Sequence, residues 1–204
     1  MEFITYSSKL NKQELLQYNI FISNQAQIND GVKLYFGVKV YGQSCIGANT
    51  ELHSNVELSN SVIGNDCKIF SSMISDCEVG NNCVIKPFCN LSNSQLGSNC
   101  VVGNFSCVSN SSVGNKVNIY SLCSITNTEI GNNTIIHSGV CCEPNENEIS
   151  IGDNVMVGVN ATIIKPVIIS DNATVEANSV VTKDIDVGEI ATNTIKQVNK
   201  AGRK

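Results

Sequence analysis

Residues 91–102 read Leu-Ser-Asn-Ser-Gln-Leu-Gly-Ser-Asn-Cys-Val-Val, and this stretch decides the fold. Its aliphatic side chains recur about every six residues, whereas an amphipathic helix would place them three and four residues apart. An interval of six suits a triangular coil in which each of three short strands directs one aliphatic side chain inward. Three such strands with their corners need about 17 residues, so these 12 residues predict the greater part of one turn of a solenoid.

The same pattern recurs along the chain as an aliphatic residue, then Gly or Ser, then mostly Asn or Asp. Seven copies, separated by 16, 17, 17, 17, 21 and 18 residues, begin at Ile63, Val79, Leu96, Val113, Ile130, Ile151 and Ile169. Gly, Asn and Asp tolerate the positive φ that sharp corners need. A repeat this short cannot bury an apolar face alone, so the coils must stack. We therefore predict an all-β solenoid of roughly nine turns between residues 22 and 181.

The chain outside the repeats divides into two short segments. Residues 1–21 are predicted to cap the solenoid, with a helix over residues 11–17 that blunts its first open edge. The β-helix is expected over residues 22–188, and residues 189–204 form a basic tail with no acid after Glu189. The one long step, from Ile130 to Ile151, has its excess in residues 143–148, and such insertions often line a binding face.

Composition limits the partners and the compartment. The chain has 204 residues, a formal net charge of −5 and a sequence pI of about 5.0, which argues against nucleic acid or an acidic membrane surface as a partner. No apolar run approaches the roughly 18 residues of a membrane span. The N-terminal residues lack the pattern of a secretory signal. A cytoplasmic protein is therefore expected.

The ten cysteines are predicted to be packed thiols in a reducing compartment. Seven of them fall into two series, each expected at one equivalent site on successive coils: Cys67, Cys83 and Cys100, and then Cys89, Cys107, Cys123 and Cys141. No Cys-x-x-Cys is present, and the adjacent pair Cys141–Cys142 does not have zinc spacing. No metal site is predicted.

Six stretches of the chain resemble the hexapeptide-repeat acyltransferases, and most closely the acetyltransferase domain of the bifunctional N-acetylglucosamine-1-phosphate uridyltransferase/glucosamine-1-phosphate acetyltransferase. They are residues 61–67, 84–88, 102–105, 129–133, 151–158 and 180–184. The resemblance implies a left-handed parallel β-helix, a homotrimer with active sites between shafts, and acetyl-CoA along the last coils. No Gly-rich loop of the uridyltransferase half is found, so synthesis of a UDP-sugar is not expected.

Several residues depart from the pattern of that family. Cys107 and Ser109 stand where the resemblance places a Glu and a Lys, Ser121 where it places the catalytic His, and Ser124 where it places a Tyr. The family's Asn-Tyr-Asp signature has become Pro-Asn-Glu at residues 144–146, or is shifted around it. The sugar-phosphate chemistry is therefore expected to be lost or rewritten.

Acetyl transfer needs a base that accepts a proton from the acceptor, and His suits that role near neutral pH. The chain has two His residues, His53 and His137. His137 lies about one coil after the position of the family's catalytic His and just before the long insertion, where Glu143 is one of three acids expected to orient it. His137 is therefore the catalytic candidate, and a surface or inter-subunit His is the alternative.

The remaining site residues follow from the resemblance and from the insertion. Asn104, Glu143 and Asn145 are expected to bind the acceptor, although Asn104 also suits a plain corner residue. For the cofactor, Gly158 and Ala177 match small residues that let pantetheine approach the backbone, and three cations are expected to meet the CoA phosphates: Lys165, Lys183 and Lys196. A carbonic-anhydrase site is excluded because it needs three His ligands.

Two hypotheses remain for the function. The first is an acetyl-CoA-dependent acetyltransferase that acts on a sugar, an amino sugar or another small acceptor, with sugar phosphates among the candidates. The second is a non-catalytic trimeric β-helix that descended from such an enzyme and now binds a partner or ligand. Binding of acetyl-CoA discriminates between them.

Overall fold

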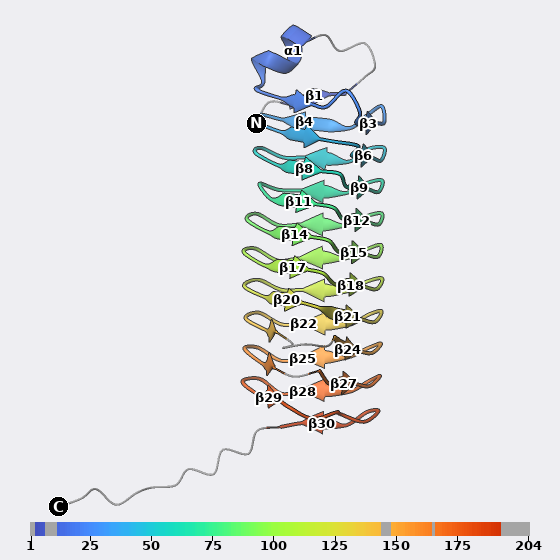
Figure 1. The fold of residues 1–204 in the computed structure, drawn as a ribbon, viewed down its shortest axis with the longest axis vertical. Coiled ribbons are helices and arrows are strands. Elements are labelled where there is room, and N and C mark those ends of the chain that lie inside the picture. The colour runs from blue at the N-terminus through green and yellow to red at the C-terminus, as the bar shows by residue number, and fades with distance from the viewer. Residues whose placement is uncertain (1–2, 7–11, 144–147, 165, 193–204) are drawn as a thin grey trace, which may run out of the picture.

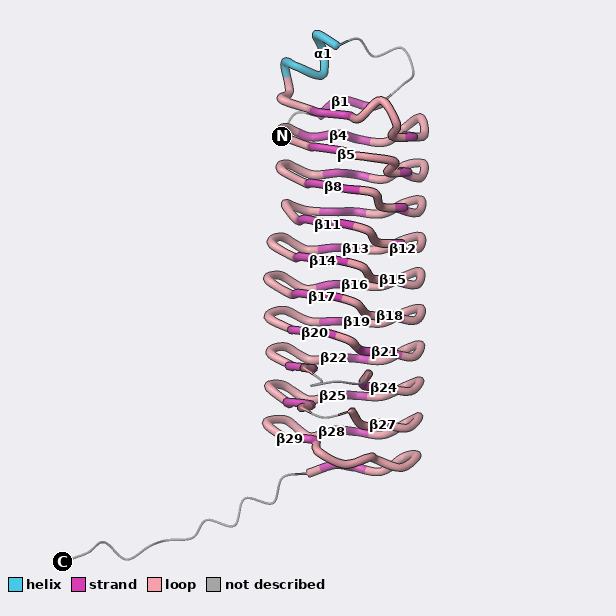
Figure 2. Tube along the Cα trace, in the orientation of Figure 1, coloured by secondary structure: helices cyan, strands magenta, loops and turns pink. Residues whose placement is uncertain are grey.

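The fold is a triangular shaft, seen from the side in Figure 1 with α1 at one end and the last coils at the other. The computed structural model describes residues 3–6, 12–143, 148–164 and 166–192. Three β-sheets form the faces, here called sheets A, B and C, and the chain passes from A to B to C in each coil. Figure 2 shows the successive coils one below another.

The strands of each sheet, over the described residues, follow in spatial order. Sheet A contains β1 (Phe3–Thr5), β4 (Lys33–Tyr35), β7 (Glu51–Leu52), β10 (Lys68–Ile69), β13 (Val84–Ile85), β16 (Val101–Val102), β19 (Asn118–Ile119), β22 (Ile135–Ile136), β25 (Met156–Val157), β28 (Thr174–Val175) and β30 (Ile190–Ala191). Sheet B contains β2 (Phe21–Ile22), β5 (Lys39–Tyr41), β8 (Glu57–Ser59), β11 (Met73–Ser75), β14 (Asn90–Ser92), β17 (Cys107–Ser109), β20 (Ser124–Thr126), β23 (Cys141–Cys142), β26 (Thr162–Ile163) and β29 (Val180–Val181). Sheet C contains β3 (Gln27–Ile28), β6 (Cys45–Ile46), β9 (Val62–Ile63), β12 (Glu78–Val79), β15 (Gln95–Leu96), β18 (Ser112–Val113), β21 (Thr128–Ile130), β24 (Ile149–Ile151) and β27 (Ile168–Ile169).

The coils send one inward side chain from each face into the shaft, and these are aliphatic apart from residues such as Cys142 in β23. In sheet A the parallel register pairs Leu34 with Leu52 and, at the other end, Val157 with Val175. These inward side chains are at most 2% exposed: Leu34, Leu52, Ile69, Ile85, Val102, Ile119, Ile136, Val157 and Val175. Burying one such side chain contributes about 1.5–3 kcal/mol, so the six-residue interval read from the sequence is the period of the core.

The N-terminal end is covered by two elements. The helix α1 (Lys12–Gln17) lies where the sequence predicts a capping helix, and Leu15 packs against the core. Strand β1, which has no repeat signature, pairs antiparallel with β4, so that Phe3 lies opposite Tyr35. The edge of β4 is therefore paired, and β1 is the first strand of sheet A in the described residues.

The corners use left-handed backbone, as the sequence predicts. At the corner between sheets A and B, Asn55, Asn160 and Asn178 have φ between 55° and 59°. Three consecutive coils instead place bulky apolar residues at this position: Phe88, Phe105 and Leu122, with φ of 64°, 58° and 64° and exposed fractions of 62%, 58% and 65%. The rings of Phe88 and Phe105 stack at 5.0 Å. We call these three residues the apolar ridge.

The first cysteine series is confirmed and the second is wrong. Cys67, Cys83 and Cys100 are buried at one corner and donate to the carbonyls of the next coil, and all ten thiols are free. Cys89 and Cys123 are buried at the corner before sheet B, whereas Cys107 and Cys141 begin β17 and β23 and are partly exposed. The steps between these four cysteines are alternately one residue longer and one residue shorter than a coil, and a shift of one residue turns a side chain to the other face.

The C-terminal coils stay paired beyond the last repeat phrase. Ile185 bridges to Ile169, and β30 pairs with β28. Residues 189–192 of the expected tail are thus described against the shaft, while residues 193–204 lie outside the described part. No helix in the described part of the chain is long and apolar enough to cross a membrane.

Candidate functional site

One column of side chains at the corner between sheets A and B carries both histidines. It consists of the residue that follows the inward residue of each sheet A strand, and we call it the corner column. From β4 to β28, its members are Tyr35, His53, Phe70, Lys86, Gly103, Tyr120, His137, Gly158 and Glu176. Rings in adjacent coils stack because the coils are one strand spacing apart, about 4.8 Å.

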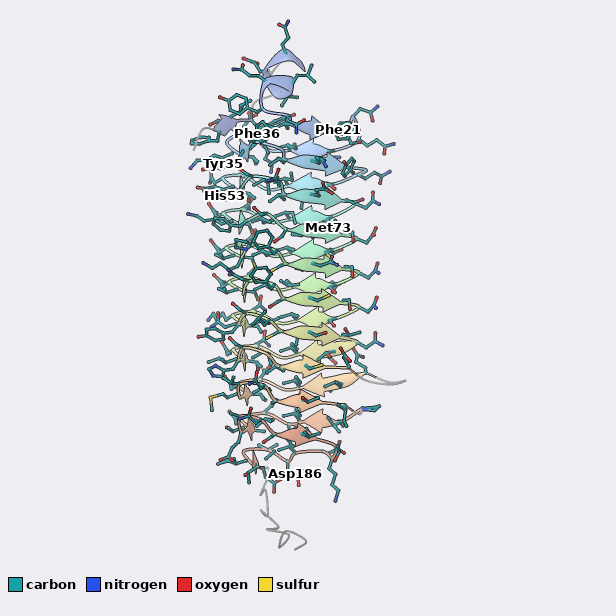
Figure 3. All side chains as sticks on the ribbon, turned by 90° about the vertical axis from the view of Figure 1, so that its left-hand side faces the viewer. Phe21, Tyr35, Phe36, His53, Met73 and Asp186 are labelled. Atoms are coloured by element: carbon teal, nitrogen blue, oxygen red, sulfur yellow. The ribbon has the colours of Figure 1, made fainter. Side chains whose placement is uncertain are left out.

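His53 is closed on both faces. Its ring lies 4.4 Å from that of Tyr35 and 4.1 Å from that of Phe70, each at an interplanar angle of 16°, and Figure 3 shows Tyr35 and His53 one above the other on one edge. Lys86 Nζ lies over the outer face of Phe70 at 6.0 Å. Burial lowers the pKa of His53 even though Nε2 is 3.3 Å from Glu51 Oε2. His53 is therefore a packed, structural residue.

His137 has one ring face covered and a groove on the other side. Tyr120 stacks on it at 5.2 Å with an interplanar angle of 6°. The next residue of the corner column is Gly158, so the column places no side chain on the second face. A mostly apolar groove of about 400 Å³ opens there, lined by His137, Met156, Gly158, Val159, Thr174, Val175, Glu176, Ala177 and Ile190. We call it the His137 groove.

Gly158 is required by the close approach of the next coil. A Cβ at this position would lie 2.5 Å from the backbone nitrogen of Ala177 and 2.8 Å from the carbonyl carbon of Glu176. Because these atoms belong to the backbone, they cannot move aside as a side chain can. The glycine thus allows tight stacking of the coils and forms the floor of the groove.

A second interruption of the column lies on the other side of Tyr120. A Cβ at Gly103 would lie 2.4 Å from the backbone nitrogen of Ser121. A groove of about 270 Å³ opens beside it, lined by Lys86, Val101, Gly103, Asn104, Asn118, Ile119, Tyr120 and Ser121. The Tyr120–His137 pair is therefore flanked by one groove on each side.

The structure brings together some of the predicted site residues and separates others. His137, Gly158 and Ala177 line the His137 groove, and Asn104 lines the groove at Gly103. Lys183 lies apart from them, exposed in a hollow at the C-terminal end of the shaft. Three further predicted residues lie outside the described residues: Asn145, Lys165 and Lys196.

Glu143 does not orient His137 in the described part of the chain. Its Oε1 accepts a hydrogen bond from Ser124 Oγ at 3.5 Å. Burial, together with the nearby Glu143 carboxylate, raises the pKa of the Cys141 thiol. Glu143 follows β23 while His137 precedes it, so the strand separates the carboxylate from the corner. The acid instead belongs to a polar group on sheet B with Ser124 and Cys141.

Sequence reasoning missed Tyr120 and Glu176, which are the neighbours of His137 and Gly158 in the corner column. The signal was present, because Tyr120 precedes His137 by the length of one coil. Glu176 follows Gly158 at the slightly longer step that separates Ile151 from Ile169 in the same coils. In the described residues, no three His, Cys, Asp or Glu side chains gather closely enough to hold a metal ion.

Comparisons with known proteins place this arrangement in context. A family model described as the hexapeptide repeat of succinyl-transferase matches residues 148–183. The bifunctional protein GlmU of Halalkalibacterium halodurans is 34% identical over 71 residues, which cover 35% of this chain. The chain spans only 16% of the length of that curated relative.

Solved structures match over most of the chain. The Arabidopsis UDP-N-acetylglucosamine acyltransferase superposes with a TM-score of 0.73 at 16% identity, over 84% of this chain and 70% of that chain. LpxA from Acinetobacter baumannii gives 0.56 at 21% identity, over 87% and 70%. These solved structures confirm the predicted all-β, left-handed parallel β-helix, and the matches to the hexapeptide-repeat model and to GlmU confirm the resemblance to hexapeptide-repeat acyltransferases.

Proposed function

We propose that this protein is an acyl-CoA-dependent acyltransferase that uses acetyl-CoA as donor, His137 as base, and a sugar, amino sugar or other small molecule as acceptor. The observation that carries the proposal is an imidazole at the edge of an apolar, glycine-floored groove in the C-terminal coils. Similarity to the succinyl-transferase repeat and to GlmU and LpxA, all matched in the comparisons, supports the reaction class.

The His137 groove suits the pantetheine arm of the donor. Gly158 brings no side chain, and Ala177 brings a single methyl group, so a thin chain can approach the backbone of both coils. Met156, Val159 and Ile190 supply apolar surface at 42%, 42% and 64% exposure. A narrow apolar slot with few polar groups is typical of sites for extended organic ligands.

We assign the role of the base to His137, whose main chain is held by the coils on both sides. Its main-chain N–H donates to the Val157 carbonyl at 2.9 Å, and its carbonyl accepts from the Cys123 thiol at 3.1 Å. The imidazole takes the proton of the acceptor hydroxyl or amine as this atom bonds to the acyl carbon. The carbon–sulfur bond then breaks, and the proton passes to the departing CoA thiolate.

The other predicted residues divide between the two substrates. We assign Lys183, Lys165 and Lys196 to the CoA phosphates as point charges near the last coils. Asn104 is assigned to the acceptor, in the groove that has the outer face of Tyr120 as one wall. Glu143 and Asn145 are also assigned to the acceptor.

We further propose that the protein works as a homotrimer. The apolar ridge supports this assembly, because three adjacent side chains of Phe88, Phe105 and Leu122 are each more than half exposed. Exposed apolar patches of this kind mark interaction sites. A contact along one corner of the shaft can close into a ring about an axis parallel to the shaft, because every copy then uses the same coils.

Calorimetric titration with acetyl-CoA tests the donor, with desulfo-CoA as the non-reacting ligand. Micromolar binding at one site per chain supports the proposal. Absence of heat at millimolar ligand over several temperatures contradicts it and favours the non-catalytic scaffold. Gly103→Ala is the matched control for Gly158→Ala, because both add a methyl group against the backbone of the next coil and only Gly158 lines the proposed donor groove.

A further inference from the structure

The interior of the corner between sheets A and B contains a ladder of hydrogen bonds from side chain to main chain. Ser72 Oγ donates to the carbonyl of Lys86 in the next coil at 2.9 Å, and Ser106 Oγ donates to that of Tyr120 at 3.0 Å. At the same position of two other coils, the Cys89 thiol donates to the carbonyl of Gly103 at 3.0 Å and the Cys123 thiol to that of His137 at 3.1 Å. Each donor is thus satisfied by the coil below it.

Ser179 occupies this position in the last coil and has no partner in the described part of the chain. It is 2% exposed, and its hydroxyl makes no hydrogen bond there. In the other coils the acceptor is the carbonyl of the residue that follows the next sheet A strand. For Ser179 this residue is Thr192, which follows β30. Ser179 lines a hollow of about 360 Å³ together with Val181, Ile185 and Ala191. A buried hydroxyl without an acceptor destabilises the fold, so we expect a carbonyl to accept a hydrogen bond from Ser179.

The adjacent strand edge is also unpaired. β29 is the last strand of sheet B in the described residues. In the coil above, Thr162 N and Ile164 N donate to the carbonyls of Ser179 and Val181. Val180 and Thr182 hold the equivalent places in β29, so their N–H groups face the end of the shaft. An edge of this kind accepts an extended segment by strand addition.

We propose that residues 193–197 of the same chain dock on this edge as a further strand of sheet B. Strand β30 ends at Ala191 and the described part of the chain ends at Thr192, so residues 193–204 follow directly after the last strand of sheet A. Ser179 lies at the fourth position after Val175, the inward residue of β28, so the same count from Ala191 places Ile195 at the buried corner. Lys196 then faces outward, and Gln197 covers the end of the core with a polar group, as terminal repeats require.

Charge favours this occupant over an unrelated peptide. Residues 182–192 carry one basic and three acidic residues, Lys183 against Asp184, Asp186 and Glu189. Residues 193–204 carry four basic residues and no acid. A tethered segment also binds at a high effective concentration. The inference does not depend on the proposed acyltransferase activity.

Amide hydrogen exchange of the peptide that spans residues 178–184 tests the docking. We compare the full chain with a chain truncated after Thr192. Exchange at Val180 and Thr182 should be slower in the full chain by at least about tenfold, because two N–H groups gain acceptors. Equal exchange in the two chains would overturn the proposal.

Two matched substitutions locate the contact. Ile195→Asp places a charge at the buried corner and should remove the protection, whereas Val198→Asp, the same type of change beyond the docked strand, should keep it. Ser179→Ala should accelerate exchange in the full chain and not in the truncated chain, because only the full chain positions the Thr192 carbonyl. An Ile195→Asp chain that keeps full protection would contradict the register.

Mixing distinguishes the chain's own tail from that of a neighbouring copy. Isotope-labelled truncated chain is combined with full chain, and exchange is measured on the labelled copy. Docking within one chain predicts that the labelled copy stays unprotected. Protection acquired on mixing would assign the edge to the tail of a second copy and overturn docking in cis.

Discussion

The two histidines stand in the same corner column, five coils apart, and their surroundings are opposite. His53 lies between the rings of Tyr35 and Phe70, and its side chain is 20% exposed. His137 has Tyr120 on one face and Gly158 after it, with a groove of about 400 Å³ beside it. The same residue type at the same position is thus sealed at one place and accessible at the other.

The difference lies in the neighbours and not in the histidines. A solenoid repeats its positions, so each coil offers the same outward direction at the corner. A ring in the next coil packs against the face of the histidine, whereas a glycine in the next coil leaves that face accessible to a ligand. Binding sites in this shaft are therefore expected where the corner column is interrupted, at Gly158 and at Gly103.

Replacing each histidine by phenylalanine should give the largest contrast. Both variants keep a ring in the stack, so the shaft should stay folded. His137→Phe removes the base, and acetyl transfer should fall by about 10²–10⁴-fold, the usual contribution of a general base. His53→Phe should leave turnover unchanged. Steady-state rates with a screened acceptor measure the effect, after circular dichroism has shown that both variants fold.

Equal rates in the two phenylalanine variants would remove His137 from the mechanism. A loss in both variants would instead mean that the stack acts as one unit and that the contrast between its two parts is wrong.

Adding a methyl group to each glycine of the column comes next in size. Gly158→Ala and Gly103→Ala should each destabilise the fold by about 1–3 kcal/mol, because the new Cβ meets backbone atoms. Acetyl-CoA affinity should fall by at least about tenfold in Gly158→Ala alone, a loss of about 1.4 kcal/mol. Calorimetry and denaturant unfolding separate the two effects. Similar affinity losses in both variants would mean that general distortion, and not the groove, is responsible.

The sequence was sufficient for the fold because inward residues and corner residues recur at a fixed interval. Ile63, Val79 and Leu96 all face the core as their spacing predicts. It was not sufficient for β1, which joins the sheet through antiparallel pairing that no repeat encodes. The same holds for Cys107, whose one-residue shift along the coil turns it outward.

The candidate site could be predicted only in part from the sequence. His137, Gly158 and Ala177 were named separately, and the structure places them in one groove. The stack with Tyr120 and the sealing of His53 depend on which residues fall one coil above and below. That information requires the register of each corner, which varies by a residue or more between coils.

The coils between the two histidines allow a smaller and sign-dependent test. Phe105 sits at a left-handed position where Asn stands in other coils, so Phe105→Asn should raise the stability of the isolated chain by about 1 kcal/mol. It should also weaken the proposed trimer, because the apolar ridge loses a side chain that is 58% exposed. Unfolding at low protein concentration measures the first effect, and light scattering measures the second.

Lys116→Asn is the matched control for this test. Lys116 is exposed, has φ of 57° and lies at a different corner, so the substitution has the same backbone effect without touching the ridge. A trimer that survives Phe105→Asn as well as it survives Lys116→Asn would assign the contact to another surface.

The smallest expected effect is the pH dependence that arises from the closed stack. Burial lowers the pKa of His53 below the 6.5 of the unfolded chain, so the folded protein keeps the ring neutral while the unfolded chain takes up a proton. The contribution of His53 to the free energy of unfolding is therefore fully present above pH 6.5 and is lost as the pH falls below it. Lys33 lowers the pKa of Glu51 from 4.5, so protonation of Glu51 causes a further loss of stability at a more acidic pH.

Between pH 6.5 and 4.5 the free energy of unfolding of His53→Phe should decline less than that of the natural chain, because phenylalanine has no proton to bind. Parallel profiles for the two proteins in this interval would show that the stack does not hold His53 neutral, and the closed half of the comparison would then need another explanation.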